Sequence, residues 1–285
     1  MFREALKITN NSIIIALPMI FGLKLIELYT MFINSSANSN EKLIFGTVTL
    51  VLMIGLFAAG WFYIVKKTIE TNKKEFIMEK DKYKEIFETL KKMPEGIAKY
   101  FLSFVLAYLI FIAVQILILP FVVILGTKLF GHLDEGLYQS IQQLAAYNIT
   151  VNDFVNGLTE SQLFYFAKWI LLFFTVLLCL SYIFMLWIPE IMYSSRNPFI
   201  ALGTSIVKLF KNFFSSIGIY LVIILFIIVT LFVMLLLPKH PLTVLFFECL
   251  KFYSYMYFTI LIFTYYNRKF ITNGTQSEVD ENEEE

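Results

Sequence analysis

Six long apolar runs constrain this chain more than any other feature of its sequence. They cover residues 13–33, 43–65, 100–125, 163–188, 213–237 and 242–266. A helix that crosses a bilayer needs about 20 apolar residues, and each of these runs is long enough. Lipid offers no partner to a free backbone N–H or C=O group, so each run must be helical, and the alternating pattern of a membrane barrel is absent. We therefore predict an all-α integral membrane bundle of six helices.

Composition supports the bilayer as the solvent of this chain. Hydrophobic residues make up 58% of the sequence and charged residues 16%, whereas soluble domains are roughly 45–50% apolar and about 25% charged. A net charge of +1 gives no reason to expect a nucleic-acid partner. Two cysteines inside apolar runs and two histidines give no reason to expect a disulfide framework, a metal site or a cofactor.

Basic residues are unevenly divided between the connections, which predicts the orientation. The segment 66–99 holds ten lysines and seven acidic residues, whereas 126–162 holds one lysine and four acidic residues. Connections rich in Lys and Arg stay in the cytoplasm, so we expect both termini and 66–99 there. A competing interpretation takes Arg3, Lys7 and 13–22 as a signal peptide cleaved near 35–37, which would leave five spans.

A unit of one short amphipathic segment and two apolar runs occurs three times in the sequence. The segments 2–12, 85–96 and 197–212 each precede a pair of runs. Residues 1–270 then form one transmembrane domain, with 66–99 as a charged helical segment on its cytoplasmic side. The segment 271–285, which is rich in acidic residues, is predicted to be a disordered tail.

The third amphipathic segment predicts a helix that lies in the membrane interface. Asn197 suits the N-cap and Pro198 the first helical position. Apolar residues then recur at helical spacing and would enter the acyl boundary, while lysines near the end would face anionic headgroups. The alternative is a linker helix packed on the bundle. The residues of the two faces include Ala201, Leu202, Lys208 and Lys211.

Charged residues inside the first and last runs form the candidate functional cluster. Lys24 and Glu27 lie in the first run, and Glu248, Lys251 and Tyr255 share one face of the last. Because ionised groups in the bilayer usually face the bundle and find partners, we predict the cross-pairs Lys24–Glu248 and Glu27–Lys251. Three interpretations remain open. They are a structural clamp, a polar site for a headgroup, ion or small solute, and snorkelling without a partner.

Motifs of enzymes are missing from the sequence. It contains no Walker loop, no HExxH and no G-x-S-x-G elbow. Glu190, which follows Pro189 at the end of the fourth run, is expected to be a carboxylate at the membrane interface. An intramembrane enzyme is therefore the least favoured of three function classes. The other two are a non-enzymatic protein that organises lipids or partner proteins, and a transporter or lipid-translocating protein that uses the polar cluster.

The stretch "WIPEIMYSSRNPFIALGTSIVKLFKNFFSSIG", residues 187–218, resembles a pattern in bacterial membrane proteins. Pro189, Ala201, Leu202 and Ser205 carry the match. The similar proteins are the YciC-like proteins and the membrane domain attached to some glycerophosphodiester phosphodiesterases. The resemblance implies a six-span protein of the bacterial cytoplasmic membrane, accessory to envelope or lipid handling and associated with membrane lipids. It supplies no catalytic residues, because the phosphodiesterase catalytic domain is absent here.

Overall fold

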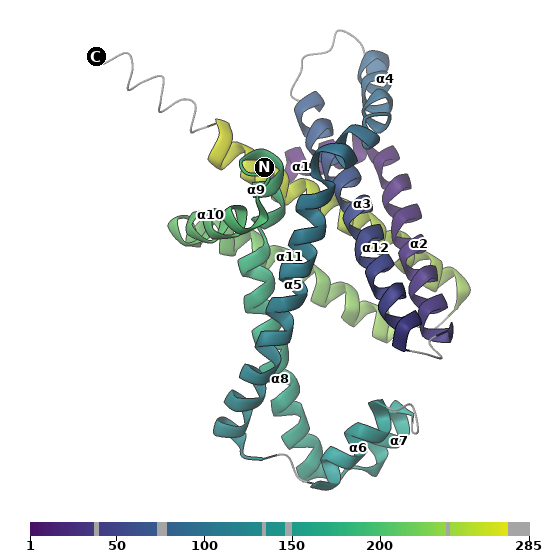
Figure 1. The fold of residues 1–285 in the computed structure, drawn as a ribbon, viewed down its shortest axis with the longest axis vertical. Helices are drawn as coiled ribbons and strands as arrows, with labels where there is room; N and C mark the ends of the chain where they lie inside the picture. Colours follow the sequence, from purple (N-terminus) through teal and green to yellow (C-terminus); the bar gives the residue numbers. More distant parts are fainter. Residues whose placement is uncertain (37–39, 73–78, 133–134, 146–149, 238–239, 273–285) are drawn as a thin grey trace. The chain divides into compact units, whose positions relative to one another are not determined.

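Helices form all the regular structure that the computed structural model describes (Figure 1). The described residues are 1–36, 40–72, 79–132, 135–145, 150–237 and 240–272. Six stretches are long and apolar enough to cross a membrane, which confirms the predicted all-α class and the number of spans. The helices of these spans are α2 (Ala16–Ser36), α3 (Asn40–Asn72), α5 (Met93–Phe130), α8 (Glu160–Phe184), α11 (Phe213–Leu236) and α12 (Pro241–Tyr266).

The fourth apolar run is divided between two helices. Helix α8 ends at Phe184, and the short helix α9 (Trp187–Tyr193) begins after a two-residue turn. Pro189 lies in the first turn of α9, where its missing N–H group would have no helical partner in any case. The predicted span 163–188 lies within the fourth candidate span, Glu160–Tyr193, and the turn after Phe184 makes α9 a separate element.

A short helix precedes each pair of spans, as the repeat predicts for two of the three segments. These helices are α1 (Phe2–Asn11), α4 (Glu79–Leu90) and α10 (Pro198–Lys211). The middle segment is displaced, because 85–96 covers the end of α4 and the start of α5. Residues 271–272 belong to a π-helical turn, η2 (Asn267–Thr272), and the rest of the predicted tail lies outside the described residues.

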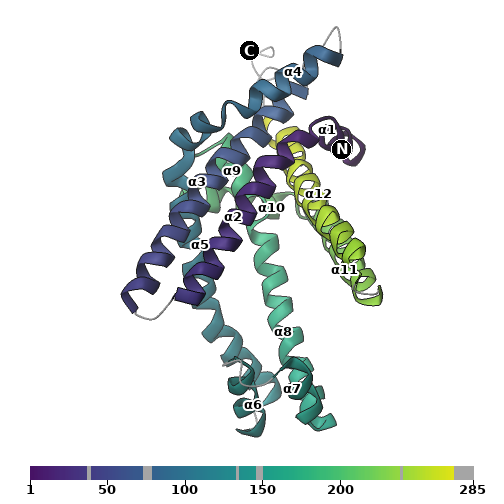
Figure 2. The same cartoon turned by 90° about the vertical axis from the view of Figure 1, so that its right-hand side faces the viewer.

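The chain divides into two compact units, which are described separately. The first contains Met1–Leu109 and Ile183–Glu285. Within it, α2 packs on α3, and α12 packs on α1, α2 and α3 (Figure 2). Phe62 of α3 stacks between Phe104 of α5 and Phe263 of α12, with ring centroids 5.5 and 5.9 Å away. This aromatic stack joins three spans from distant parts of the sequence.

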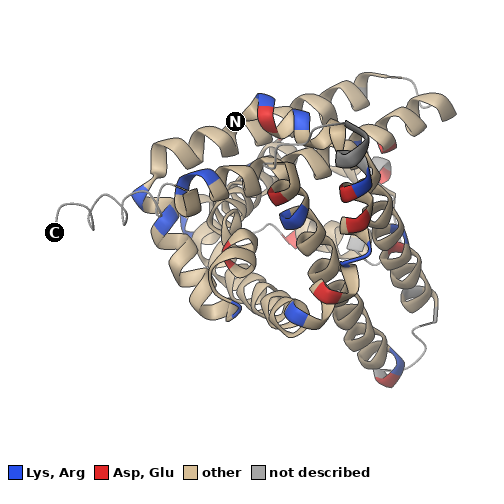
Figure 3. Ribbon diagram, turned by 90° about the horizontal axis from the view of Figure 1, so that it is seen from above, with Lys and Arg blue, Asp and Glu red and all other residues tan. Residues whose placement is uncertain are grey.

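The charged segment 66–99 is less solvated than its composition predicts. Thr68, Ile69, Ile86 and Thr89 are buried, so both α3 near its end and α4 present an apolar or small-residue face to the first unit. The buried face follows the helical period, while Lys84, Lys91, Lys92 and Lys99 are exposed. Figure 3 shows charged residues as short bands on otherwise uncharged helices.

The second unit, Ile110–Tyr182, contains two helices that the sequence analysis does not predict. Helices α6 (Glu135–Ala145) and α7 (Val151–Gly157) pack around the buried side chains of Leu137, Phe154 and Leu158. Thr150 and Asp153 form a capping box at the start of α7. The hydrogen bonds from the side chain and backbone of Thr150 lower the pKa of the Asp153 carboxyl.

Candidate functional site

Four charged residues of α2 and α12 form a chain of alternating sign in the first unit. Within α2, Lys24 Nζ lies 2.7 Å from Glu27 Oε2, and within α12, Lys251 Nζ lies 2.7 Å from Glu248 Oε2. Lys24 Nζ lies 4.0 Å from Glu248 Oε2 and links the two helices. We name Glu27, Lys24, Glu248 and Lys251, which have no net charge together, the charge chain.

The charge chain contains one of the two predicted cross-pairs. Lys24 and Glu248 do meet, at the outer limit of an ion pair. Glu27 and Lys251 are not paired directly among the ion pairs of the described residues, because each has a nearer partner three positions away in its own helix. The contact between Lys24 and Glu248, which links α2 to α12, is therefore the longest of the three ion pairs in the charge chain.

The charge chain lies on the flank of the first unit. The side chains of Lys24 and Glu27 are 46% and 49% exposed, and those of Glu248 and Lys251 are each 40% exposed. The neighbouring Phe247 and Phe252 are buried, as expected for the packed face of α12. Each of the four side chains is therefore accessible in part to a molecule that lies beside the bundle.

A cavity of about 270 Å³ lies between α11 and α12 and reaches the charge chain. We name it the α11–α12 cavity. The two helices meet through the rings of Phe226 and Phe258, whose centroids are 5.3 Å apart at an angle of 81°. The walls combine apolar side chains with polar groups from both helices. The polar and charged lining residues are Thr230, Glu248, Lys251, Ser254 and Tyr255.

Tyr255, the fifth predicted member of the cluster, lies beside the charge chain and lines this cavity. It follows Lys251 by four residues, so the two share a face of α12. The structure thus brings the five predicted residues to one region, where they make different contacts. Four form ion pairs, and the half-exposed tyrosine forms part of the cavity wall.

Helix α10 has the predicted N-terminus and a different arrangement of faces. The Asn197 side chain accepts hydrogen bonds from the N–H groups of Phe199 and Ile200, which confirms the N-cap. Small or apolar residues, including Pro198 and Ala201, are buried against neighbours, and Leu202 is half-buried. The face away from the bundle is also apolar. Its exposed large side chains are Phe199, Ile200, Val207 and Phe210.

Lys208 turns into the bundle, so its predicted place among headgroups is wrong. Its Nζ donates to both carboxylate oxygens of Glu190, at 3.0 and 2.8 Å, and to the Tyr266 hydroxyl at 2.7 Å. Tyr266 in turn donates to Glu190 at 2.6 Å and lies 2.7 Å from the Ser194 hydroxyl oxygen. Lys211 is exposed, as predicted for the interfacial face.

Glu190 is likewise not the interfacial carboxylate that the sequence predicts. Its side chain is 2% exposed, and that of Lys208 is 27% exposed. Charges this far from water need a partner, and Glu190 finds two donors. The spacing of Ala201 and Ser205 could have revealed the site, because Lys208 continues the same helical face. We name Glu190, Lys208 and Tyr266 the elbow network, since it fastens α9, α10 and α12 together.

The C-terminal end of α9 is held by two further side chains of the first unit. Lys66 Nζ and the Tyr100 hydroxyl donate to the Met192 carbonyl oxygen, at 2.6 and 3.2 Å. The last carbonyls of a helix lack helical partners and carry partial negative charge, so a cation there is favourable. Lys66 Nζ also lies 4.6 Å from the centre of the Tyr193 ring.

Potential metal ligands and the two cysteines are the other reactive groups of the sequence. There, no group of three or more His, Cys, Asp or Glu residues is placed to hold a metal ion. Cys179 and Cys249 are free and exposed. The charge chain and the α11–α12 cavity together form the candidate site.

Comparison with known proteins returns no relative. No family model matches this chain, and neither a curated protein nor a solved structure matches it. The resemblance of residues 187–218 to the YciC-like group therefore stays a prediction. The six long apolar helices indicate a membrane protein.

Proposed function

We propose that this chain is a non-enzymatic membrane protein that holds lipid, as an envelope or lipid-associated accessory factor. The observation that carries the proposal is the α11–α12 cavity, whose lining combines apolar side chains with the Glu248–Lys251 pair. The apolar walls match an acyl chain. The paired charges match a zwitterionic headgroup, whose ammonium would approach Glu248 and whose phosphate would approach Lys251.

The depth of the charges in α12 supports a lipid ligand that enters from the side. Glu248 is seven residues from the start of α12 at Pro241, which corresponds to about 10 Å along the helix. An ionised residue at the centre of a bilayer costs about 2.5–3.5 kcal/mol on insertion scales, and less near the surface. A headgroup drawn into the cavity would add partners for charges that the protein otherwise pairs within itself.

The test is lipid retention by a variant without the two charges. We expect Glu248→Gln with Lys251→Met to retain much less phosphatidylethanolamine than the wild type, measured by native mass spectrometry after release from nanodiscs. The control is Glu88→Gln with Lys91→Met, an exposed pair of the same spacing, 2.6 Å apart. Equal retention by the two double variants would show that the charge chain binds no headgroup.

Stability measurements on the same variants separate ligand binding from folding. Glu248→Gln alone leaves Lys251 without its ion-pair partner and gives the charge chain a net positive charge, so we expect a loss of up to about 2.5–3.5 kcal/mol. Adding Lys251→Met leaves the neutral pair Lys24–Glu27 and should restore most of that loss. A double variant as unstable as the single one would argue against the alternating chain as a balanced unit.

Lipid translocation is the second candidate, because the charge chain lies part-way along the spans at the edge of a cavity. Charged side chains at this depth could bind a headgroup as it passes from one leaflet to the other. Proteoliposomes with a fluorescent phospholipid and a membrane-impermeant quencher distinguish the two functions. Retained lipid without transbilayer movement favours the accessory factor. Movement that Glu248→Gln with Lys251→Met abolishes favours the translocating protein.

The proposed location is a bacterial cytoplasmic membrane with both termini in the cytoplasm. The support is the excess of lysine in 66–99 over that in 126–162. Alkaline phosphatase fused after residue 150 should be active, because it would lie outside, and the same enzyme fused to the C-terminus should be inactive. The reverse pattern would invert the topology.

A further inference from the structure

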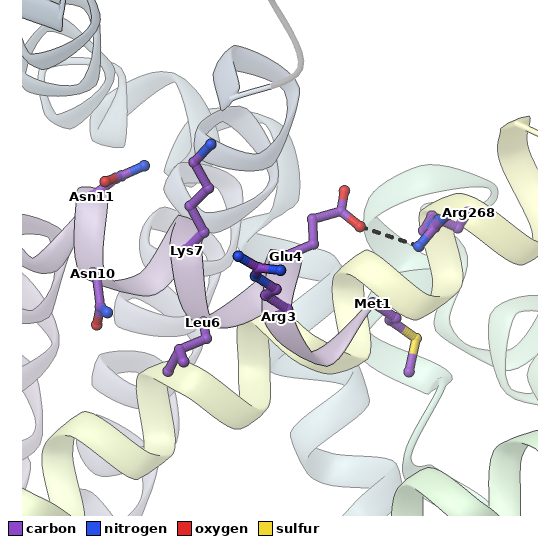
Figure 4. A pocket seen from close by; sticks show the side chains of 8 residues that line it. All are labelled: Met1, Arg3, Glu4, Leu6, Lys7, Asn10, Asn11 and Arg268. Carbon is purple, nitrogen blue, oxygen red and sulfur yellow. Dashed lines mark hydrogen bonds and ion pairs between the residues drawn. The ribbon is translucent and has the colours of Figure 1, made fainter.

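A second cavity, of about 820 Å³, lies against α1 and the start of η2 (Figure 4). Three basic side chains line it, Arg3 and Lys7 of α1 and Arg268 of η2. Glu4 is the single acidic residue of the lining. We name this cavity the α1 pocket, and its lining carries two more positive than negative side chains.

The sequence of α1 explains why the basic groups gather on one side. Arg3, Lys7 and Asn11 are separated by four residues each and therefore share a helical face. Ala5 and Ile8 on another face are buried, and α1 packs on α12. The Tyr253 hydroxyl of α12 donates to Asn10 Oδ1 at 2.6 Å, which fixes the C-terminal part of α1.

Two of the three cations remain available to a ligand. Arg268 Nη1 lies 3.3 Å from Glu4 Oε2, the ion pair drawn in Figure 4. Neither Arg3 nor Lys7 takes part in an ion pair among the described residues, and both are exposed. Arg268 retains further N–H groups of its guanidinium. The pocket therefore offers a concentration of unneutralised N–H donors.

The α1 pocket lies at one end of the first and last candidate spans. Ile13, two residues after α1 ends, begins the first candidate span. Arg268 lies two residues after the end of α12 and four residues before the last candidate span ends at Thr272. Phe2 and Leu6 of α1, beside the basic residues, are exposed and apolar. A helix with this pattern places its apolar groups toward acyl chains and its cations among phosphates.

We propose that the α1 pocket binds the phosphate group of an anionic phospholipid headgroup. Guanidinium groups match phosphate oxygens with paired N–H donors, and Lys7 adds a mobile ammonium. The Asn11 carboxamide can contribute N–H groups of its own. The proposal uses different residues from the charge chain, since Arg268 follows Glu248 by twenty positions, about 30 Å in a helix. An experiment can therefore refute lipid binding at one site and leave the proposal for the other site standing.

The test compares lipid selectivity of the full chain in nanodiscs of equal phosphatidylglycerol and phosphatidylcholine. Native mass spectrometry should show phosphatidylglycerol enriched on the wild type. Arg3→Gln with Lys7→Gln should lower the enrichment by about fivefold for each cation removed. The matched control, Lys91→Gln with Lys92→Gln, removes two exposed lysines elsewhere and should keep the wild-type enrichment.

Several results would overturn the proposal. One is equal enrichment for the α1 variant and its control. Another is full displacement of phosphatidylglycerol by millimolar inorganic phosphate, which would make free phosphate the ligand. A third is selectivity seen solely after truncation at Thr272, which would make the acidic segment of the chain the natural occupant. If the double variant fails to fold, Arg268→Gln provides the same test from the other side of the pocket.

Discussion

At the scale of single residues, the elbow network shows how strongly burial governs the role of a charge. Lys208 and Lys211 lie three positions apart at the end of one helix, yet Lys208 pairs with Glu190 and Lys211 is exposed. A buried pair broken on one side leaves an uncompensated charge, whereas an exposed pair leaves a charge that water solvates. The same chemistry thus has different consequences at the two depths.

The elbow network predicts a strong double-mutant cycle. Glu190→Gln and Lys208→Met should each lower the free energy of unfolding by about 3–5 kcal/mol, and the double variant should recover a large part of the loss. The free energy of unfolding of each variant is measured by chemical unfolding in a mild detergent, with tryptophan fluorescence as the signal. Glu88→Gln with Lys91→Met, on an exposed pair, should change stability by less than about 1 kcal/mol. Additive losses at Glu190 and Lys208 would contradict the pairing.

At the scale of elements, α10 is defined by its cap and by two apolar faces. Asn197 satisfies two N–H groups of the first turn, and Pro198 takes the position at which no donor is needed. Ala201 and Ser205 allow close packing, while Phe199 and Phe210 remain exposed. A helix that is apolar on both sides is suited to lie between the bundle and lipid.

The cap of α10 gives a prediction with a conservative control. Asn197→Ala should lower stability by about 1 kcal/mol, because two N–H groups lose their acceptor. Asn197→Asp keeps an acceptor oxygen and adds a charge favourable at a helix start, so it should preserve stability. Thermal unfolding in nanodiscs compares the variants. A loss of the same size for both would mean that the cap is not what Asn197 contributes.

At the scale of the whole molecule, some glycines mark positions where two helices pack too closely for a side chain. A Cβ atom at Gly55 of α3 would lie 2.5 Å from Val105 Cγ2 of α5, whereas at Gly218 of α11 no atom lies within 4 Å. Ala59, one turn after Gly55, is fully buried. This step of small residues lets α3 and α5 pack closely in the first unit.

The same substitution should therefore have opposite effects at the two glycines. Gly55→Ala should lower stability by about 1–3 kcal/mol, because the new methyl group overlaps a packed side chain. Gly218→Ala should raise it by up to about 1 kcal/mol, since alanine favours the helix and nothing obstructs it. Unfolding of both variants and the wild type in the same detergent measures the two changes in stability. Equal effects at the two positions would contradict the close approach of α3 and α5.

Local patterns in the sequence determined the class, the spans and the cap of α10. Hydrophobic length and the need to satisfy backbone groups act within one segment, so the six spans could be predicted to within a few residues at most ends. Asn197 acts on the next turn of its own helix and was equally predictable. The pairs Lys24–Glu27 and Glu248–Lys251 follow from helical spacing alone, whereas the contact of Lys24 with Glu248 depends on the packing of α12 on α2.

Tertiary structure alone decided which groups stand opposite one another. Periodicity identifies a face of a helix but not its partner, so the pairing of Lys208 with Glu190 and Tyr266 required the packing of three helices. The same holds for the α11–α12 cavity and for the α1 pocket, which join residues far apart in the chain. Such contacts depend on distances between elements, and those distances are set by the whole set of packed side chains.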